Sequence, residues 1–344
     1  MASETPLRLG VIGAGWFASR RHCPDILRHP ETALSALCRR DAAELQKLAA
    51  HFEVGHCFTD YRELIHSGLV DAVVVCSPHH LHYEHTLAAL EAGLHVLLEK
   101  PITIDPAEGR RLVELAAARG LVLVVGQNPP YWSHCRLLRE QIAAGALGTI
   151  ESAHVHWVGN AKGVLGLEAL PADLPGVVRP SLFRGDAAQN GGGFLMDGGT
   201  HLISELLWCT GLRVAEVSAV MDDADWDVRA ALSARLSNGA LATLSILADS
   251  GTPAKRQHSL YYGSAGTAEL RGFPFSLRIT GGKEELHRRE DELPAALTPV
   301  GDLVECIRRQ GLPAMSGELA VHVVEVIQAA YRAAQRTQPV KLAP

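Results

Sequence analysis

Between Leu7 and about Gln127, the sequence alternates short apolar runs with longer segments of helical periodicity. The apolar runs have the length of strands and lie in LRLGVIG, ALSALCRR, DAVVVCS, HVLLEKP and LVLVVGQ. Strands that alternate with helices favour a parallel sheet with helices on both faces. We therefore predict an α/β domain with a doubly wound parallel sheet at the start of the chain.

The first apolar run ends in a glycine-rich turn. Gly13, Gly15 and Ala18 have the spacing G-x-G-x-x-A, directly after a strand and at the start of a helix. Gly13 permits a tight turn, Gly15 lets a pyrophosphate approach the backbone, and Ala18 keeps the helix close to the strand. The pattern predicts a dinucleotide-binding Rossmann domain over residues 1–127, and a tight turn without a ligand is the alternative.

Two arginines follow the second apolar run. In ALCRRD, Arg39 and Arg40 occupy the place where an acid is expected if the cofactor ribose has a free 2′-OH. Arginine suits a 2′-phosphate because it forms forked, charge-assisted hydrogen bonds. We predict NADP in preference to NAD, with Asp41 as the residue that could favour NAD. Solvated charges at a strand end are the alternative.

The pattern changes after residue 127. TIESAHVHWVG indicates a longer strand, and the two runs flanking Asn238 and Gly239 indicate a hairpin. An apolar-periodic helix is predicted over about 318–336. We therefore predict a second domain over residues 128–344, of the α+β type, built on a mostly antiparallel open sheet. The Gly- and Pro-rich segment 159–180 is interpreted as a lid, or equally as an oligomer arm or surface loop.

The stretch GGGFLMDGGTH, residues 191–201, places Asp197 and His201 four residues apart among five glycines. On a helix, these two side chains would share one face. Each glycine in that turn would cost about 1 kcal/mol relative to alanine. We interpret the glycines as the place where the nicotinamide and a substrate approach the backbone. A helix-surface ion pair is the alternative.

Composition excludes several classes of function. The net charge of −6 and the lack of a basic stripe argue against binding to nucleic acid. No apolar run is long enough to span a membrane, and no signal-peptide pattern is evident at the N-terminus. Seven cysteines without a C-x-x-C pair indicate reduced thiols and a cytoplasmic protein. His79, His80 and His82, like the pair His154 and His156, lack familiar ligand spacing, so no metal site is predicted.

The sequence resembles the Gfo/Idh/MocA family of nicotinamide-dependent oxidoreductases, named for glucose-fructose oxidoreductase and inositol dehydrogenase. The resemblance rests on the glycine turn, SPHHLH, EKP, FRGD before GGGFLMDGGTH, YYGSAGTAEL and the closing SGELAVHVVEVIQAAYRAAQRTQPVKL. It implies a lysine between nicotinamide and substrate at Lys100, before a cis proline at Pro101. It also implies a substrate pocket lined by Asp197 and His201, with His201 as the general base or acid.

The resemblance further implies that His82 shapes the cofactor loop and that Arg184 lies near the cofactor. An open sheet that serves oligomer contacts implies a homodimer or homotetramer. The sequence also departs from the family pattern: it has His79 in place of asparagine, Pro129 and Pro130 in place of arginine, and Ser204, beside Glu205, in place of aspartate. These departures concern the substrate contacts more than the class of reaction.

We predict an NAD(P)-dependent dehydrogenase or reductase acting on a carbinol or ketone of a sugar, polyol or derivative. Histidine titrates near neutral pH and can take the hydroxyl proton, while a lysine can stabilise alkoxide character. The predicted catalytic residues are Lys100, Asp197 and His201. The predicted cofactor-binding residues are Gly13, Gly15, Trp16, Phe17, Arg39, Arg40, Ser77, His79, His82, Glu99, Lys100, Asn128 and Arg184. Tyr131 and Trp132 are predicted to face the same pocket.

Two alternatives stay open. One is an enzyme that keeps its NAD(H) bound while it cleaves glycosides or passes hydride between sugars. The other is a dinucleotide-binding sensor without catalysis. The sequence leaves the substrate, the carbon oxidised and the direction of reaction open.

Overall fold

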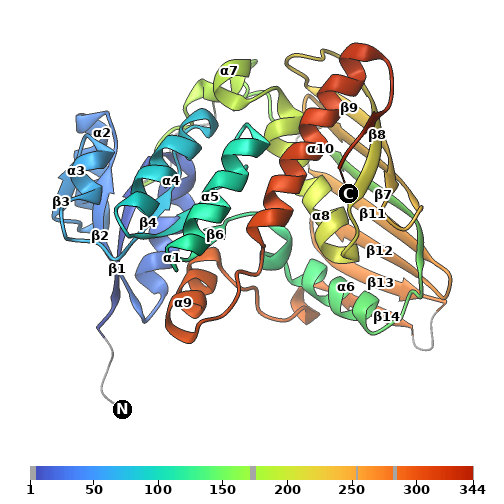
Figure 1. Cartoon of the computed structure of the whole chain (residues 1–344), viewed down its shortest axis with the longest axis horizontal. Coiled ribbons are helices and arrows are strands. Elements are labelled where there is room, and N and C mark those ends of the chain that lie inside the picture. The colour runs from blue at the N-terminus through green and yellow to red at the C-terminus, as the bar shows by residue number, and fades with distance from the viewer. Residues whose placement is uncertain (1–4, 171–175, 253–254, 282–284, 344) are drawn as a thin grey trace.

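The predicted alternation of strands and helices forms a parallel sheet of six strands, sheet A, in the order β3-β2-β1-β4-β5-β6 (Figure 1). The computed structural model describes residues 5–170, 176–252, 255–281 and 285–343. The strands of sheet A are β1 Leu7–Ile12, β2 Thr32–Cys38, β3 His56–Phe58, β4 Ala72–Val75, β5 His95–Leu98 and β6 Leu123–Val125. This arrangement confirms the doubly wound α/β fold.

Helices cover both faces of sheet A. One face packs against α3 Tyr61–Ile65, α4 His82–Glu91 and α5 Pro106–Ala118. The other face packs against α1 Cys23–Arg28, α2 Ala42–Phe52 and α9 Pro299–Arg309. Strand β4 shows why: all four of its residues are buried, with Val73 and Val75 on the first face and Ala72 and Val74 on the second. Continuous apolar strands are typical of parallel sheets buried on both sides.

Helix α9 reaches sheet A from far along the chain. Thr298 caps it by accepting a hydrogen bond from the N–H of Gly301, and Pro299 occupies its first turn. Its apolar face packs on β5 and β6. A helix from the second half of the sequence therefore completes the core of the dinucleotide-binding fold.

The second sheet, sheet B, has nine strands in the order β14-β13-β12-β11-β7-β10-β9-β8-β15. They are β7 Ile150–Val158, β8 Val214–Met221, β9 Arg229–Leu236, β10 Leu241–Leu247, β11 Arg256–Gly263, β12 Thr267–Gly272, β13 Ser276–Thr280, β14 Leu286–Arg289 and β15 Val340–Lys341. All neighbours pair antiparallel except β7 and β10. The predicted hairpin joins β9 to β10, with Gly239 at φ 90°. The mostly antiparallel open sheet is confirmed.

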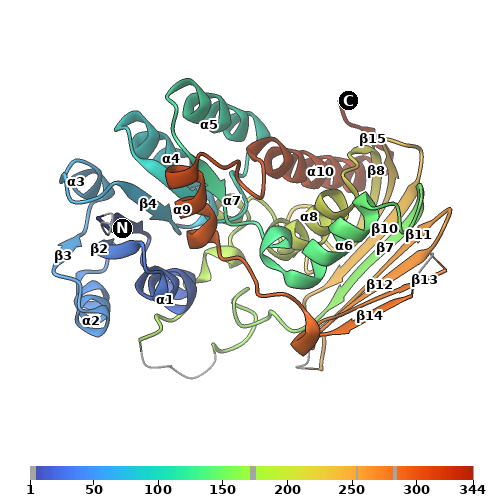
Figure 2. The ribbon, with the colours of Figure 1, turned by 90° about the horizontal axis from the view of Figure 1, so that it is seen from below.

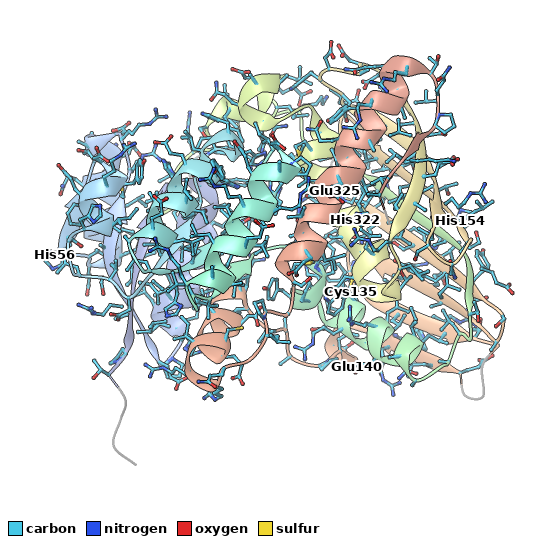
Figure 3. The ribbon with its side chains drawn as sticks, viewed as in Figure 1. His56, Cys135, Glu140, His154, His322 and Glu325 are labelled. Atoms are coloured by element: carbon cyan, nitrogen blue, oxygen red, sulfur yellow. The ribbon has the colours of Figure 1, made fainter. Side chains whose placement is uncertain are left out.

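Only one face of sheet B carries helices (Figure 2). These are α6 Ser133–Ala143, α8 Thr200–Thr210 and α10 Gly317–Arg336. Strand β9 alternates strictly between exposed and buried residues, as expected for a sheet with one solvated face. His154 and His156 both lie on the uncovered face, where His154 hydrogen-bonds Thr243 at 2.7 Å (Figure 3).

Helix α10 joins the two halves of the molecule. It packs against α5 of the first domain and against α8 and β8 of the second. His322 fixes it to β8, because its Nε2 accepts the N–H of Val214 at 3.1 Å while its Nδ1 lies 2.8 Å from Glu325 (Figure 3). Its bounds agree with the helix predicted over 318–336. In the part of the chain that the structure describes, no helix is long and apolar enough to cross a membrane.

Candidate active site

A cavity of about 1390 Å³ opens at the carboxyl ends of the strands of sheet A and extends to the helical face of sheet B. Ligands of open α/β sheets bind at this edge of the sheet. All of the residues predicted for the catalytic and cofactor sites line the cavity. The segment 159–180, interpreted as a lid, also contributes to its lining through residues such as Val164 and Arg179. Residues 171–175 of that segment lie outside the described residues.

The glycine turn forms the floor of the cavity at the N-terminal end. Gly13 has φ 78°, and a Cβ there would lie 2.6 Å from the backbone nitrogen of Ser77. A Cβ on Gly15 would meet no atom closer than 3.6 Å, so this glycine keeps space open on the cavity side. The helix that follows begins with a π-helical turn, Ala18–His22, rather than the regular helix expected. A pyrophosphate fits this cradle, because the backbone is bare and the helix N-terminus faces it.

The end of β2 presents two arginines and an aspartate to the cavity. Arg39, Arg40 and Asp41 all line it, and Arg39 Nη1 donates to the carbonyl of Ala14 at 3.2 Å. Asp41 also caps α2, because its Oδ1 accepts the N–H of Glu44 at 3.0 Å.

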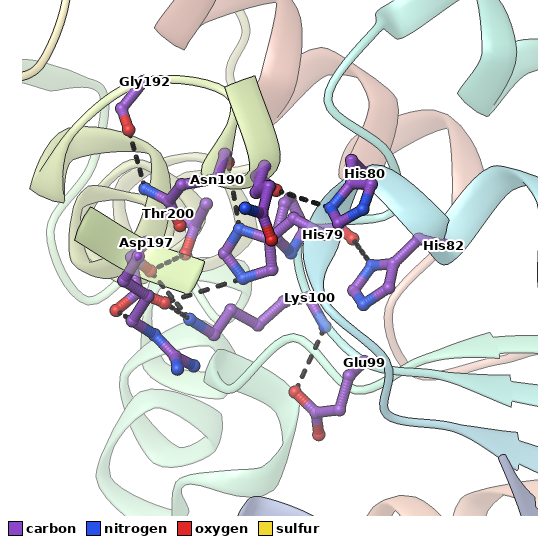
Figure 4. Close-up of polar contacts among 12 residues, drawn as sticks. His79, His80, His82, Glu99, Lys100, Asn190, Gly192, Asp197 and Thr200 are labelled. Atoms are coloured by element: carbon purple, nitrogen blue, oxygen red, sulfur yellow. Dashed lines mark hydrogen bonds and ion pairs between the residues drawn. The ribbon is translucent and has the colours of Figure 1, made fainter. Parts of the chain in front are cut away.

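Lys100, Asp197 and Arg184 form a buried charge cluster, and Figure 4 shows Lys100 pointing toward Asp197. Lys100 Nζ donates to the Oδ1 and to the backbone carbonyl of Asp197, both at 2.8 Å. Arg184 Nε lies 3.0 Å from Oδ2 of the same carboxylate. Burial alone would raise the pKa of Asp197, but Arg184 and Lys100 hold it well below its usual value. Asp197 is therefore a carboxylate that positions two cations.

His201 lies beside this cluster, with Asn128 as its nearest described hydrogen-bonding partner. Its Nδ1 is 3.2 Å from Asn128 Nδ2, whereas Asp197 interacts with the two cations. The turn Leu195–Gly199 between Asp197 and His201 is π-helical, so the α-helical spacing considered for an ion pair between them does not apply. Burial, and then the charge of Lys100, lower the pKa of His201 to about 3. Its imidazole is neutral at neutral pH.

Two further histidines hold the loop between β4 and α4. His82 lies 2.7 Å from the carbonyl of Pro101 and 2.9 Å from that of Ser77, so it ties the EKP segment to this loop. The Lys100–Pro101 peptide bond is cis, as the resemblance implies. His79 Nδ1 lies 3.0 Å from the carbonyl of Asn190, and its Nε2 lies 3.7 Å from Asp197 (Figure 4). Burial lowers the pKa of His79 well below its usual value.

The first three glycines of the motif serve packing within the protein. A Cβ on Gly191 would lie 2.6 Å from Ile104, one on Gly192 2.5 Å from the hydroxyl of Tyr331, and one on Gly193 2.1 Å from the backbone of Asp227. Gly198 and Gly199 are likewise confined by Phe194 and Leu195. The interpretation that ligands approach the backbone here is wrong for Gly191, Gly192 and Gly193, since the atoms that exclude a side chain belong to the protein. Gly198, in contrast, also lines the cavity.

Asp227 and Tyr331 are positioning residues that the sequence did not reveal. Tyr331 donates its hydroxyl proton to Asp227 Oδ1 at 2.6 Å and accepts the N–H of Gly193 at 2.9 Å. Asp227 Oδ2 accepts the N–H of Leu195 at 2.9 Å. The pair therefore holds the backbone that leads into Asp197. In the sequence, Tyr331 is recognisable only as one residue of an apolar-periodic helix, and no motif indicates a role for Asp227.

The residues that depart from the family pattern differ in whether they face the cavity. Pro129 and Pro130 form a tight turn that directs Tyr131 into the core, where its hydroxyl donates to Asp302 of α9 at 2.9 Å. Tyr131 therefore does not face the cavity as predicted, whereas Trp132 does, with its ring 5.9 Å from that of His201. Ser204 and Glu205 point away from the cavity.

Ser204 and Glu205 support the wall of the cavity from the protein interior. Ser204 accepts a hydrogen bond from Gln127 at 3.2 Å. Glu205 is fully buried and accepts from Tyr261 at 2.9 Å and from Gln257. Burial raises the pKa of Glu205. Gln257, Phe273 and Lys255 reach the cavity from the second domain, although the sequence analysis did not single them out.

The histidines weighed as metal ligands contact the protein. His79, His80 and His82 each lie within hydrogen-bond distance of a backbone carbonyl. Over the described ranges, one group of three potential ligands is close together: His22, Cys76 and Glu99. His22 Nε2 lies 2.8 Å from Glu99 Oε1, so these two are already paired.

Comparison with known proteins agrees with the fold. Residues 7–127 match the oxidoreductase family with an NAD-binding Rossmann fold, and residues 135–269 match the GFO/IDH/MocA C-terminal domain. The chain is similar to D-glucoside 3-dehydrogenase of Escherichia coli (strain K12), with 32% identity over 61% of this chain and 55% of that protein. It is also similar to D-xylose 1-dehydrogenase (NADP(+)) of Hypocrea jecorina, with 33% identity over 54% of this chain and 51% of that protein.

These matches thus span about half the length of the two curated relatives. Among solved structures, an oxidoreductase domain protein from Kribbella flavida shares the fold with a TM-score of 0.84 and 24% identity, covering 99% of this chain and 100% of that one. Both halves of the sequence and both sheets thus match one family. The chain belongs to the Gfo/Idh/MocA family of oxidoreductases with an NAD-binding Rossmann fold.

Proposed function

We propose that this protein is an NAD(P)-dependent oxidoreductase that moves a hydride between the nicotinamide and a carbinol or ketone of a sugar or polyol. The observation that carries the proposal is the convergence of Lys100, Asp197 and His201 in the cavity that extends from the glycine turn. Both curated relatives named above are dehydrogenases of sugars or glycosides, which supports the substrate class.

The residues of this chain divide the chemistry among them. A bound nicotinamide supplies the hydride acceptor or donor. Lys100, held by two bonds to Asp197, polarises the reacting oxygen and stabilises alkoxide character. His201, neutral at neutral pH, exchanges the hydroxyl proton. Asn128 can support either tautomer of His201, because its amide offers an NH₂ or, after rotation, an oxygen.

We propose NADP as the preferred cofactor. Arg39 and Arg40 line the cavity at the end of β2, and Asp41 is engaged as the cap of α2. Fluorescence titration should give tighter binding of NADPH than of NADH. The double variant Arg39→Ala with Arg40→Ala should lose that preference, while its affinity for NADH changes less. Tighter binding of NADH by the wild type contradicts the preference.

The remaining expectations concern the location of the protein in the cell, its oligomeric state and its partners. We propose a cytoplasmic homodimer or homotetramer that has no nucleic-acid or membrane partner. The uncovered face of sheet B, which includes the exposed residues His154, Leu241 and Val220, is the proposed contact surface. Sedimentation of the wild type and of Val220→Arg tests this, because a charge introduced within the contact should weaken the assembly.

The test of function is absorbance at the band of reduced nicotinamide, with NADP⁺ or NAD⁺ and a panel of sugars and polyols. We expect turnover that falls by at least about a hundredfold in His201→Ala. His56→Ala, exposed on β3 (Figure 3), serves as the control and should retain full turnover. Reduced nicotinamide already present in the purified protein, without turnover, would point to the retained-cofactor mechanism. Cofactor binding with no turnover on any compound would indicate a sensor.

A further inference from the structure

Two basic side chains from opposite domains lie at the mouth of the cavity. Arg20 belongs to the π-helical turn after the glycine motif, and Lys255 immediately precedes β11. Both are exposed and both line the cavity. The Arg20 guanidinium carbon lies 5.5 Å from the centroid of the Trp16 ring, and Lys255 Nζ lies 5.9 Å from that of Phe273.

Neither side chain has an acidic partner among the residues that the structure describes. Three other cations of the cavity do have one: Lys100 and Arg184 share Asp197, and Arg62 lies 2.8 Å from Glu84. Arg21, Arg39 and Arg40 also line the cavity without a described acidic partner, and we assign Arg39 and Arg40 to the cofactor phosphate. Arg20 and Lys255 therefore carry charges that no carboxylate of the described protein offsets.

These two cations are also close enough to repel each other. Desolvation and the charge of Arg20 lower the pKa of Lys255. Lys255 also makes a small contribution to lowering the pKa of His201, after burial and the charge of Lys100. Ring contacts run from Phe273, beside Lys255, to Phe275, then to Trp132 and on to His201, with centroid distances of 4.6, 5.7 and 5.9 Å. Lys255 therefore lies toward the reacting end of the cavity. Two like charges facing one space without an acid are unfavourable unless an anion binds between them.

We propose that Arg20 and Lys255 form a subsite for an anionic group carried by the sugar on which His201 acts. This inference rests on the proposed function and narrows its substrate class to sugars that bear a phosphate, a diphosphate or a carboxylate. Oxygen anions of this kind accept charge-assisted hydrogen bonds from both guanidinium and ammonium groups. The Phe273 ring, 46% exposed beside Lys255, offers an apolar surface to the part of the substrate that links the anion to the sugar.

The experiment compares neutral and anionic sugars on the whole protein saturated with NADPH. Isothermal titration calorimetry measures the affinity for D-glucose, D-glucuronate, D-glucose 6-phosphate and UDP-glucose. We expect at least one anionic sugar to bind about tenfold more tightly than D-glucose, and added KCl to reduce that advantage. Lys255→Met and Arg20→Met should abolish it, while Lys341→Met, exposed on β15, should retain it. Equal affinity for neutral and anionic sugars in the wild type overturns the proposal.

The pyrophosphate of the cofactor is the other anionic group to which Arg20 and Lys255 can bind. Fluorescence titration with NADPH, without sugar, separates the two sources. If Lys255→Met and Arg20→Met weaken NADPH binding and leave the sugar preference unchanged, the cations serve the cofactor and the proposal is overturned.

Because calorimetry needs no turnover, this proposal and the proposed function fail separately. A preference for anionic sugars that depends on Lys255, without turnover of any sugar, keeps the subsite and rejects the oxidoreductase. Turnover of neutral sugars, with no preference for anionic sugars in binding, supports the oxidoreductase and rejects the anion subsite.

Discussion

At the scale of single residues, the carboxylate of Asp197 has a clear electrostatic role, because it lies between two largely buried cations. Asp197→Asn keeps the shape of the side chain but leaves Lys100 and Arg184 without a counter-charge. We expect the free energy of unfolding to fall by about 3 kcal/mol, as when one partner of a buried ion pair is removed. Turnover should fall as well, since Lys100 loses its anchor.

Urea unfolding measures the effect, with Asp249→Asn as the matched control. Asp249 pairs with Arg229 at the surface, at 2.7 Å. Loss of such an exposed pair should cost less than about 1 kcal/mol. A similar, small cost for both variants would show that the cluster around Asp197 contributes little to stability.

The hydroxyl of Tyr331 gives a second prediction at this scale. Tyr331→Phe removes the donor to Asp227 and the acceptor for the N–H of Gly193, which leaves two buried polar groups unsatisfied. We expect a loss of about 2 kcal/mol in the free energy of unfolding. Tyr262→Phe, on the partly exposed Tyr262, should change it by less than about 0.5 kcal/mol. Equal stability of the two variants in urea would refute the role given to Tyr331.

Local sequence found some of these residues and missed others for a physical reason. Lys100, Asp197 and His201 belong to short motifs, so the linear sequence marks them. Asn128 entered the prediction as a cofactor contact, and its bond to His201 depends on the tertiary fold. Asp227 lies 104 positions from Tyr331 and carries no local pattern of its own. The partners of a residue are set by packing, which spacing in the sequence does not encode.

At the scale of elements, the glycine-rich turn before α8 depends on close backbone packing. A Cβ on Gly193 would lie 2.1 Å from the backbone of Asp227, where no side-chain rotation can relieve the clash. Gly193→Ala should therefore destabilise the protein by about 3 kcal/mol or more. Gly55→Ala, where a Cβ meets nothing within 4 Å, should be neutral or slightly stabilising. Thermal unfolding of both variants tests this, and a tolerated Gly193→Ala would contradict the packing.

Periodicity predicted the main elements but not their finer geometry. Five strands of sheet A, the hairpin at Asn238 and the long helix α10 all follow from apolar spacing and turn residues. Strand β3, His56–Phe58, was not predicted, because its three residues form no apolar run. The π-helical turns Ala18–His22 and Leu195–Gly199 do not, because a π-turn changes the helical period by a single residue. Such turns are frequent at functional sites, and here both lie in the cavity wall.

At the scale of the whole molecule, several buried histidines set the response to acid. The folded protein lowers the pKa of His134 and His201 to about 3 and that of His85 to about 4, all from 6.5. Below pH 6.5 the unfolded chain therefore binds protons that the folded protein does not, so stability falls as the pH falls. Asp227 acts in the opposite direction, because burial raises its pKa to about 6. The stability that it contributes to the protein is lost as the pH rises from 3.8 to 6.

His79, whose pKa burial also lowers, adds to the histidines, and Glu205, whose pKa burial raises, adds to Asp227. The shifted histidines outnumber these carboxyl groups, so their effect prevails. We expect the free energy of unfolding to fall by roughly 2 kcal/mol per pH unit between pH 6 and 5. In His134→Phe this slope should decrease by about 1.4 kcal/mol per pH unit, because the ring still stacks on Phe275 but no longer titrates. Urea titrations at several pH values measure the slope. A stability that is constant from pH 7 to 5 would be inconsistent with these pKa shifts.

Helix α9 has a consequence for how the molecule is made. Its residues Val300, Leu303 and Val304 close one face of sheet A, although sheet A itself ends at Val125. A ribosome that has translated the first 298 residues therefore holds a first domain whose apolar face is still open to water. The domain that is synthesised first is completed only after strands β7 to β14 have been synthesised. We expect chaperones that bind apolar surface to engage the nascent chain throughout that interval.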